Sequence, residues 1–146
     1  MRNRRSNQRG FTLIELVVVM TILALLAVLV VPKLIGRTDE ARVTATKVQI
    51  RNIESALQLY KVDNGVYPTT EQGLQALVVA PTIPPLPMNW KSGGYLGKVP
   101  LDPWKRPYVY MSPGLHDPDY DLMSYGADGE PGGEEKNADI ASWDLE

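Results

Sequence analysis

The chain opens with a short polar stretch and continues into a long apolar run. Positions 11–31 are apolar except for Thr12, Glu15 and Thr21. As a helix, this run rises ~1.5 Å per residue and spans about 31 Å, enough for the hydrocarbon core of a bilayer. The pattern therefore predicts a transmembrane or filament-core helix over residues 11–31.

A helical period continues beyond the apolar run. Apolar residues recur at spacings of three and four, which is the pattern of an amphipathic helix, and it continues to about residue 62. We therefore expect one helix of about 50 residues. One stripe should pack on a globular domain: Ile50, Ile53, Leu57 and Tyr60. A second stripe is left for contacts with other chains: Ala41, Ala45 and Val48.

Two residues weaken this helix near the end of the apolar run. Pro32 removes one backbone hydrogen bond, and Gly36 adds a second weak point. We expect a kink or a locally loosened turn there.

The remaining pattern predicts a small α+β domain, and we place the domain at residues 32–146. Thr69 and Gln72 have the spacing of a capping box, which predicts a short helix to about Val79 with a buried side formed by Leu74, Leu77 and Val78. Residues 81–103 contain six prolines and should be irregular. Residues 107–111 and 120–125 resemble strands joined through residues 112–114, so a small antiparallel sheet should pack on the long helix.

Charge is distributed unevenly along the chain. Four of the 15 basic residues stand among the first ten positions, whereas residues 117–146 hold ten carboxylates and one lysine. Basic residues before an apolar segment favour a cytoplasmic N-terminus, with the following residues on the other side of the membrane. The globular part has no basic stripe, so nucleic acid is not an expected partner. The run is too long for an ordinary secretory signal and lacks a small-residue cleavage motif.

Glu15 is the exceptional residue of the apolar run. A carboxylate at the centre of a membrane helix costs ~2.5–3.5 kcal/mol on insertion scales, so it is usually paired. The run itself contains no lysine or arginine. A cut after Gly10 would create an amine on Phe11, four residues away, which could pair with Glu15 in the same helix or in a neighbouring copy.

Residues 10–15, Gly-Phe-Thr-Leu-Ile-Glu, resemble the prepilin signal of type IV pilins and type II secretion pseudopilins. The resemblance implies that residues 1–10 are a leader removed by a membrane peptidase between Gly10 and Phe11. It also implies methylation of the new N-terminus of Phe11 and retention of the hydrophobic helix. We assign assembly of a filament to Glu15, Phe11 and Pro32.

Further motifs narrow the resemblance to the major (G-type) pseudopilins of type II secretion. They are residues 67–74 (Tyr-Pro-Thr-Thr-Glu-Gln-Gly-Leu), residues 102–104 (Asp-Pro-Trp), residues 126–129 (Gly-Ala-Asp-Gly), and Asp139-Ile140 with Trp143. The resemblance implies a pilin-like fold and a major structural subunit that polymerises in the periplasm and drives exoprotein export across the outer membrane. Ordinary type IV pilins usually close their C-terminal loop with a disulfide, which is impossible here because the chain has no cysteine.

The acidic loop at residues 125–143 is a candidate calcium site. Calcium takes six to eight oxygen ligands in irregular geometry, and the loop has no His or Cys that would favour zinc or copper. From composition alone, a solvated acidic loop without a metal is at least as good an interpretation as a calcium site. The resemblance implies one structural calcium, held by the Tyr125 carbonyl, by Asp128 and Asp139 through their side chains, and by Glu130 through its backbone. Asn137 is a further ligand and Glu134 a less certain one.

Two other polar groups are expected to be structural. Asp117, Asp119 and Asp121 alternate along the second strand and should form a surface turn, with a weak cation site as the alternative. His116 is the single histidine, and no nucleophile–base pair or phosphate-binding glycine loop accompanies it. We therefore expect an exposed turn histidine and no enzymatic activity.

The resemblance also implies the partners and location of the chain. The partners are further copies of itself, minor pseudopilins, the prepilin peptidase/methyltransferase, and an inner-membrane assembly platform with its ATPase. The chain should cross the inner membrane once, with its C-terminal domain in the periplasm. The alternatives are a type IV pilus or competence-type subunit, a non-polymerising membrane-anchored binding module, and an anchored hydrolase.

Overall fold

The computed structural model describes the backbone of residues 10–145, and the side chains of these residues except at positions 28–37 and 136. It divides into two compact units, Met1–Thr38 and Asp39–Glu146, and each is considered by itself. The expected leader, residues 1–10, lies outside the described residues apart from Gly10.

Helix α1 covers Leu13–Asn64, 52 residues, which confirms the predicted helix of about 50 residues. Its start is capped by Thr12, whose Oγ1 accepts the Glu15 N–H at 3.3 Å. Its end is followed by Gly65 at φ 80°, the left-handed conformation common after helices. The helical backbone continues through Pro32 and Gly36, so neither residue ends the helix. The side chains of this segment are not described, and the expected kink stays a prediction.

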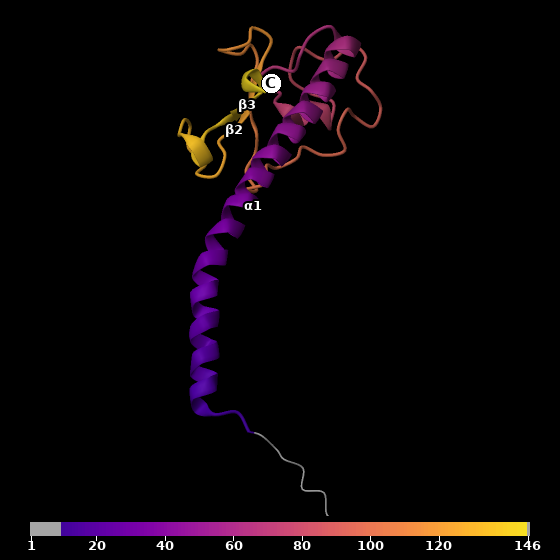
Figure 1. Cartoon of the computed structure of the whole chain (residues 1–146). Helices are drawn as coiled ribbons and strands as arrows, with labels where there is room; N and C mark the ends of the chain where they lie inside the picture. Colours follow the sequence, from indigo (N-terminus) through magenta and orange to yellow (C-terminus); the bar gives the residue numbers. More distant parts are fainter. Residues whose placement is uncertain (1–9, 146) are drawn as a thin grey trace, which may run out of the picture. The chain divides into compact units, whose positions relative to one another are not determined.

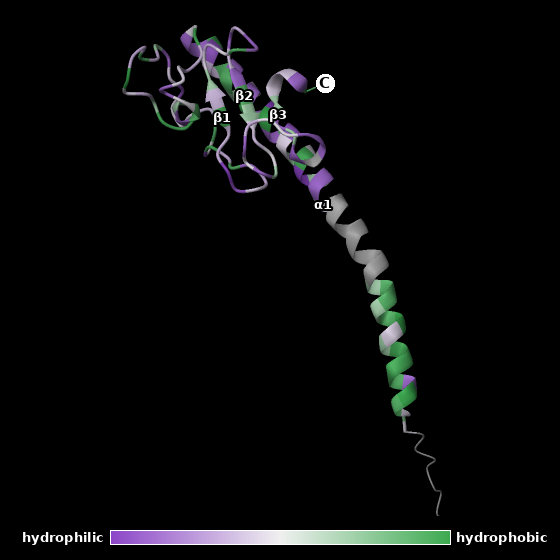
Figure 2. Cartoon of the chain, turned by 90° about the vertical axis from the view of Figure 1, so that its left-hand side faces the viewer, coloured by the Kyte–Doolittle hydropathy of each residue, from purple (hydrophilic) through white to green (hydrophobic). Residues whose placement is uncertain are grey.

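The first unit presents an apolar helix surface, which Figure 2 shows as a nearly continuous hydrophobic segment. The large apolar side chains from Phe11 to Leu26 are between 45% and 83% exposed. Within the described part of the chain, no helical stretch meets the length and hydropathy needed to cross a membrane. The predicted span of residues 11–31 includes positions 28–31, whose side chains are outside that part, and it stays a prediction.

The second unit has its core on one face of α1. Ile50, Ile53, Leu57 and Tyr60 are at most 1% exposed, as their spacing predicted. They belong to one hydrophobic cluster with four residues from later in the chain: Leu74, Leu77, Leu122 and Ile140. The second stripe, Ala41, Ala45 and Val48, is exposed and so remains available to other chains.

A three-stranded antiparallel sheet packs against this face, and Figure 1 shows β2 and β3 beside the C-terminal part of α1. The strands are β1 (Val109–Met111), β2 (Asp121–Ser124) and β3 (Ile140–Ala141), in that order. The register pairs Val109 with Met123 and Ser124 with Ile140. The predicted hairpin is confirmed with slightly shorter strands, whereas β3 was not predicted because a two-residue strand has no recognisable alternation.

The predicted capping box forms in full. Thr69 Oγ1 accepts the Gln72 N–H at 3.2 Å, and Gln72 Oε1 accepts the Thr69 N–H at 3.0 Å. The predicted helix to Val79 is wrong in type and length, because only a 3₁₀ helix over Leu74–Leu77 follows. Gly73, at φ 59° and ψ −171°, breaks the helical path directly after the cap. Leu74 and Leu77 are buried as predicted, but Val78 is only half-buried.

Two further 3₁₀ helices lie near the C-terminus. They are η2 (Glu135–Asn137) and η3 (Ser142–Asp144). Helix η2 falls inside the acidic loop, between β2 and β3, and η3 follows β3 directly. The C-terminal loop is therefore bounded by two paired strands.

Candidate functional site

The six predicted calcium ligands all lie in the loop that joins β2 to β3. The strand ladder ends with Ser124 opposite Ile140, so Tyr125 and Asp139 leave the sheet next to each other. The backbones stay close beyond that point, because a Cβ on Gly126 would come within 2.9 Å of the Ala138 carbonyl oxygen. The sheet thus brings the two ends of the acidic loop together.

Asp139 is the most informative residue of the loop. Its Oδ2 accepts the Gly132 N–H at 2.8 Å, whereas its Oδ1 is buried and has no hydrogen-bond partner. A buried carboxylate oxygen without a partner is costly, because it loses its water without replacement. A cation bound to Oδ1 would remove that cost, so the Asp139 carboxylate is suited to be a metal ligand.

The other predicted ligands supply oxygens of different kinds. Asp128 is exposed and accepts the Glu130 N–H at 3.2 Å, and the Tyr125 carbonyl accepts the Gly129 N–H at 3.2 Å. Each of these oxygens keeps a further lone pair. Asn137 is half-exposed, and its carbonyl lies directly beneath Gly133.

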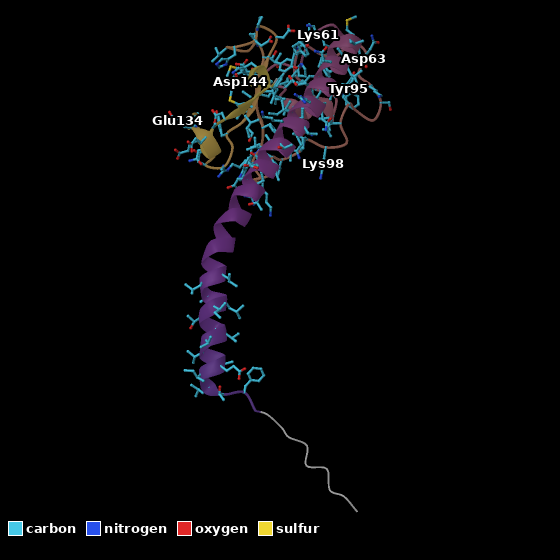
Figure 3. All side chains as sticks on the ribbon, viewed as in Figure 1. Lys61, Asp63, Tyr95, Lys98, Glu134 and Asp144 are labelled. Carbon is cyan, nitrogen blue, oxygen red and sulfur yellow. The ribbon has the colours of Figure 1, made fainter. Side chains whose placement is uncertain are left out.

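Glu134 is the weakest member of the set. Its side chain is exposed, and Figure 3 shows it on the outer part of the C-terminal loop. Its backbone carbonyl accepts the Asn137 N–H at 3.1 Å and so closes η2. This hydrogen bond gives Glu134 a structural role that requires no metal.

The described residues contain no group of three or more carboxylate, imidazole or thiol side chains that could hold a metal ion. A cation in the loop would therefore need backbone carbonyls and an amide beside Asp128 and Asp139. Calcium accepts such a mixture, whereas magnesium demands nearly ideal octahedral geometry. The carboxylate, amide and carbonyl oxygens of this loop are ligand types that calcium accepts.

A buried polar network supports the first half of the loop. Asp102 is only 3% exposed and its Oδ2 accepts the Ser124 hydroxyl at 2.6 Å. Its Oδ1 accepts the backbone N–H groups of Trp104 and Arg106. Residues 102–104 form a recognisable sequence motif, but the role of Asp102 was not predicted because its contact with Ser124 spans 22 positions.

The second acidic cluster differs from the expected surface turn in one respect. Asp117 and Asp119 are exposed, but Asp121 is only 1% exposed. Its carboxylate accepts the backbone N–H groups of Leu115, His116 and Asp117 and contacts His116 Nδ1 at 3.0 Å. Burial alone would raise the pKa of Asp121, but these hydrogen bonds outweigh it and lower the pKa to about 2.

His116 is exposed, as predicted, but it is not an isolated turn histidine. Its ring stacks on Trp143 with centroids 3.9 Å apart and an interplanar angle of 9°. Nδ1 faces the Asp121 carboxylate. The pair ties the connection between β1 and β2 to η3, at the far end of the acidic loop.

Glu15 lies in the first turn of α1, at the third helical position after its Thr12 cap. An acidic residue there is favoured by the positive end of the helix dipole. The side chain is exposed. Its carboxylate is therefore accessible to other groups.

Two protein-family models match this chain. A family model described as "Type II secretion system (T2SS), protein G" matches residues 33–143, and a second, "Prokaryotic N-terminal methylation motif", matches residues 5–31. The chain belongs to the type II secretion system protein G family.

Relatives cover this chain almost from end to end. The type II secretion system core protein G of Pseudomonas aeruginosa is 53% identical over 141 residues, which are 97% of this chain and 99% of that protein. The protein of the same name from Escherichia coli K12 is 49% identical, over 94% of this chain and 92% of its own length. The Vibrio cholerae protein is 48% identical, over 95% and 94%.

A solved relative confirms the pilin-like α+β fold. The crystal structure of the major pseudopilin from the type 2 secretion system of enterohaemorrhagic Escherichia coli matches with a TM-score of 0.67 and 43% identity. The match covers 78% of this chain and 96% of that one. This family member is thus a major pseudopilin, a structural subunit of the type II secretion pseudopilus, which confirms the main functional prediction.

Proposed function

We propose that the mature chain begins at Phe11 and polymerises through the apolar first half of α1. The observation that carries the proposal is the exposed surface of residues 11–27, on which every large apolar side chain is at least 45% exposed. A surface of this kind is not stable in water, and it marks a partner or a membrane. The membrane would hold it before assembly and other copies afterwards.

Glu15 provides the register of that assembly. Its carboxylate would accept the amine of Phe11 from a neighbouring copy as the helix enters the apolar filament core, where an unpaired charge is strongly disfavoured. Only a subunit at the correct height would bring the two charges together. This pairing selects one helix register among many with similar apolar contacts.

The test is Glu15→Ala in the full precursor, compared with Thr21→Ala. Thr21 is a polar residue of the same helix, but its hydroxyl already donates to the Val17 carbonyl at 2.8 Å. We expect Glu15→Ala to remain cleavable and to lose cross-linked multimers, while Thr21→Ala assembles like the parent chain. Normal filaments from Glu15→Ala would rule out the pairing.

The proposed partners follow from the cleavage and assembly described above. A prepilin peptidase/methyltransferase would process the junction of Gly10 and Phe11, and an inner-membrane platform with its ATPase would add subunits. Minor pseudopilins would share the filament. The chain would span the inner membrane once with its domain in the periplasm, and filament growth would drive exoproteins across the outer membrane. The role is structural, with His116 engaged by Asp121 and Trp143.

We also propose one structural calcium ion in the loop between β2 and β3. Tyr125 and Glu130 would contribute carbonyls, Asn137 an amide oxygen, and Asp128 and Asp139 carboxylates. The support is the buried, partnerless Asp139 Oδ1 and the convergence of both loop ends. Calcium would order a loop that, without cysteines, has no covalent closure.

Calcium binding is tested by thermal unfolding of the detergent-solubilised chain with calcium or with EDTA. A ligand at 100 times its Kd stabilises the folded state by ~2.7 kcal/mol. Asp128→Ala and Asp139→Ala should lose this stabilisation. Glu130→Ala should keep most of it, because only the carbonyl of that residue is proposed to bind. An unchanged response in Asp139→Ala would remove the site.

A further inference from the structure

Arg106 lies against the first half of the acidic loop, although it is 20 positions away in sequence. Its Nη1 donates to the Gly126 carbonyl at 2.8 Å. The guanidinium also lies under Gly129, because a Cβ on that glycine would overlap Cζ and Nη1 and come within 2.6 Å of Nε. The flat guanidinium therefore supports the backbone between Gly126 and Gly129.

The same backbone is held from a second side. Ser124 Oγ accepts the Gly126 N–H at 3.2 Å and donates to Asp102 Oδ2 at 2.6 Å. Asp102 Oδ1 accepts the Arg106 N–H at 2.8 Å. Both polar backbone groups of Gly126 are thus satisfied by side chains that lead back to one buried carboxylate.

The second half of the loop has no comparable support. Residues 130–135 are exposed. Among the described residues, their hydrogen bonds are short-range or lead to Asp139: the Glu130 N–H donates to Asp128 Oδ1, the Glu134 and Glu135 carbonyls accept the backbone bonds of η2, and the Gly132 N–H donates to Asp139 Oδ2. Asp139 itself keeps a buried oxygen without a partner. The loop is therefore asymmetric, with one half fixed by the fold and the other dependent on Asp139.

We propose that Arg106 is a positioning residue for the loop. It holds residues 125–129 in their ion-binding conformation before any ion arrives, so that calcium orders chiefly residues 130–138. The calcium part rests on the proposed function, whereas the support of residues 126–129 does not. Gly129 is required for two reasons: its φ of 74° and the guanidinium that occupies the space of a side chain.

The sign of the effect separates this proposal from simple electrostatics. A positive charge near a cation site repels the cation, so removing the charge of Arg106 should tighten calcium binding if charge alone mattered. Loss of a charge-assisted hydrogen bond that pre-forms the site has the opposite effect. The two accounts therefore predict changes of affinity in opposite directions.

The experiment compares Arg106→Gln, Arg106→Lys and the control Lys105→Gln in the mature chain in detergent. Lys105 is the adjacent exposed cation. Calcium titration should show about tenfold weaker binding for Arg106→Gln, equivalent to ~1.4 kcal/mol. Arg106→Lys should be intermediate, because it keeps the charge but loses the planar contact. Lys105→Gln should bind as tightly as the parent or slightly more tightly. Unchanged or tighter binding by Arg106→Gln would overturn the proposal.

Hydrogen exchange in EDTA tests the same idea without calcium. The amides of Gly126 and Gly129, which donate to Ser124 Oγ and to the Tyr125 carbonyl, should be protected in the parent chain and in Lys105→Gln, and should exchange at least tenfold faster in Arg106→Gln. The amides of residues 130–138 should exchange quickly in all three. A parent chain in which the amides of Gly126 and Gly129 are unprotected would contradict the proposal. Protection without any calcium binding would leave Arg106 as the support of the loop and would refute only the calcium site.

Discussion

Asp121→Asn is the substitution that most directly tests how the connection between β1 and β2 is held. The parent carboxylate uses both oxygens: Oδ2 accepts from Leu115 at 2.8 Å, and Oδ1 accepts from Asp117 at 3.0 Å. The His116 N–H lies within 3.2 Å of both. Asparagine has nearly the same shape but replaces one acceptor with a donor, so whichever way it turns, at least one backbone N–H faces another N–H.

The expected cost follows from two observations. The pKa of Asp121 falls from 3.8 to about 2, and a shift of that size corresponds to about 2 kcal/mol of preference for the charged form. A buried donor without an acceptor costs a further ~1–3 kcal/mol, part of which the pKa shift already contains. We therefore expect Asp121→Asn to lower the free energy of unfolding by about 3 kcal/mol. For a domain of this size, Tm would fall by roughly 10–20 °C.

The assay is near-ultraviolet circular dichroism of the detergent-solubilised chain during heating, which reports on aromatic packing in the domain. Asp119→Asn is the matched control. Asp119 is exposed and pairs with Lys61 at 3.1 Å, a type of contact worth ~0.2–1 kcal/mol. A Tm for Asp121→Asn within 3 °C of the parent would refute the reasoning.

The pH dependence gives a second check on Asp121. Because its folded pKa is lowered, its stabilisation is present above the unfolded pKa of about 4 and is lost as the pH falls towards 2. The difference in stability between the parent and Asp121→Asn should therefore be full above pH 5 and shrink from pH 4 to pH 2. A difference that stays constant over this range would contradict the assigned cause.

Three further predictions concern the cap, the loop and the processing. Gln72→Ala should destabilise the domain by about 2–4 kcal/mol in thermal unfolding, because its buried amide donates to the Ile83 and Pro85 carbonyls and its oxygen completes the cap. The control Gln75→Ala, at an exposed position, should change the stability little. Gly133→Ala should cost more stability than Gly132→Ala, because both have φ above 90° but only a Cβ at Gly133 would overlap the Asn137 carbonyl. Intact mass spectrometry of the mature chain should show loss of residues 1–10 and one added methyl group; an intact leader would contradict the proposed processing.

The elements with strong local patterns were predictable from the sequence. The spacing of Ile50, Ile53, Leu57 and Tyr60 defined the buried face of α1, and Thr69 with Gln72 defined a cap that forms in full. The type of the helix after the cap was not predictable, because Gly73 takes a backbone conformation that the composition does not specify. Strand β3 was missed because its two residues acquire their pairing only from β2.

In the candidate site, too, local features were predictable and long-range contacts were not. The acidic residues of the loop were visible in the sequence because composition marks them directly. The groups that position them were not, because Asp102 and Arg106 reach Ser124 and Gly126 across 20 or more positions. Asp121 was misjudged as part of a surface turn, since an alternating run of aspartates gives no sign that one of them accepts hydrogen bonds from three consecutive backbone N–H groups.

The cysteine-free C-terminal loop is anchored at both ends by contacts that need no metal. At one end, Arg106 and Ser124 hold Gly126. At the other end, β3 pairs with β2, and Trp143 stacks on His116. Because these anchors belong to the folded domain and its sheet, removal of the proposed calcium ion should loosen residues 130–138 without unfolding the core around Leu57 and Leu122. A ligand that orders only the outer part of a loop can change the surface that a subunit offers its neighbours while leaving the subunit folded. Calcium would then act on assembly through the loop surface, with the fold itself supported by Asp102, Arg106 and the β2–β3 ladder.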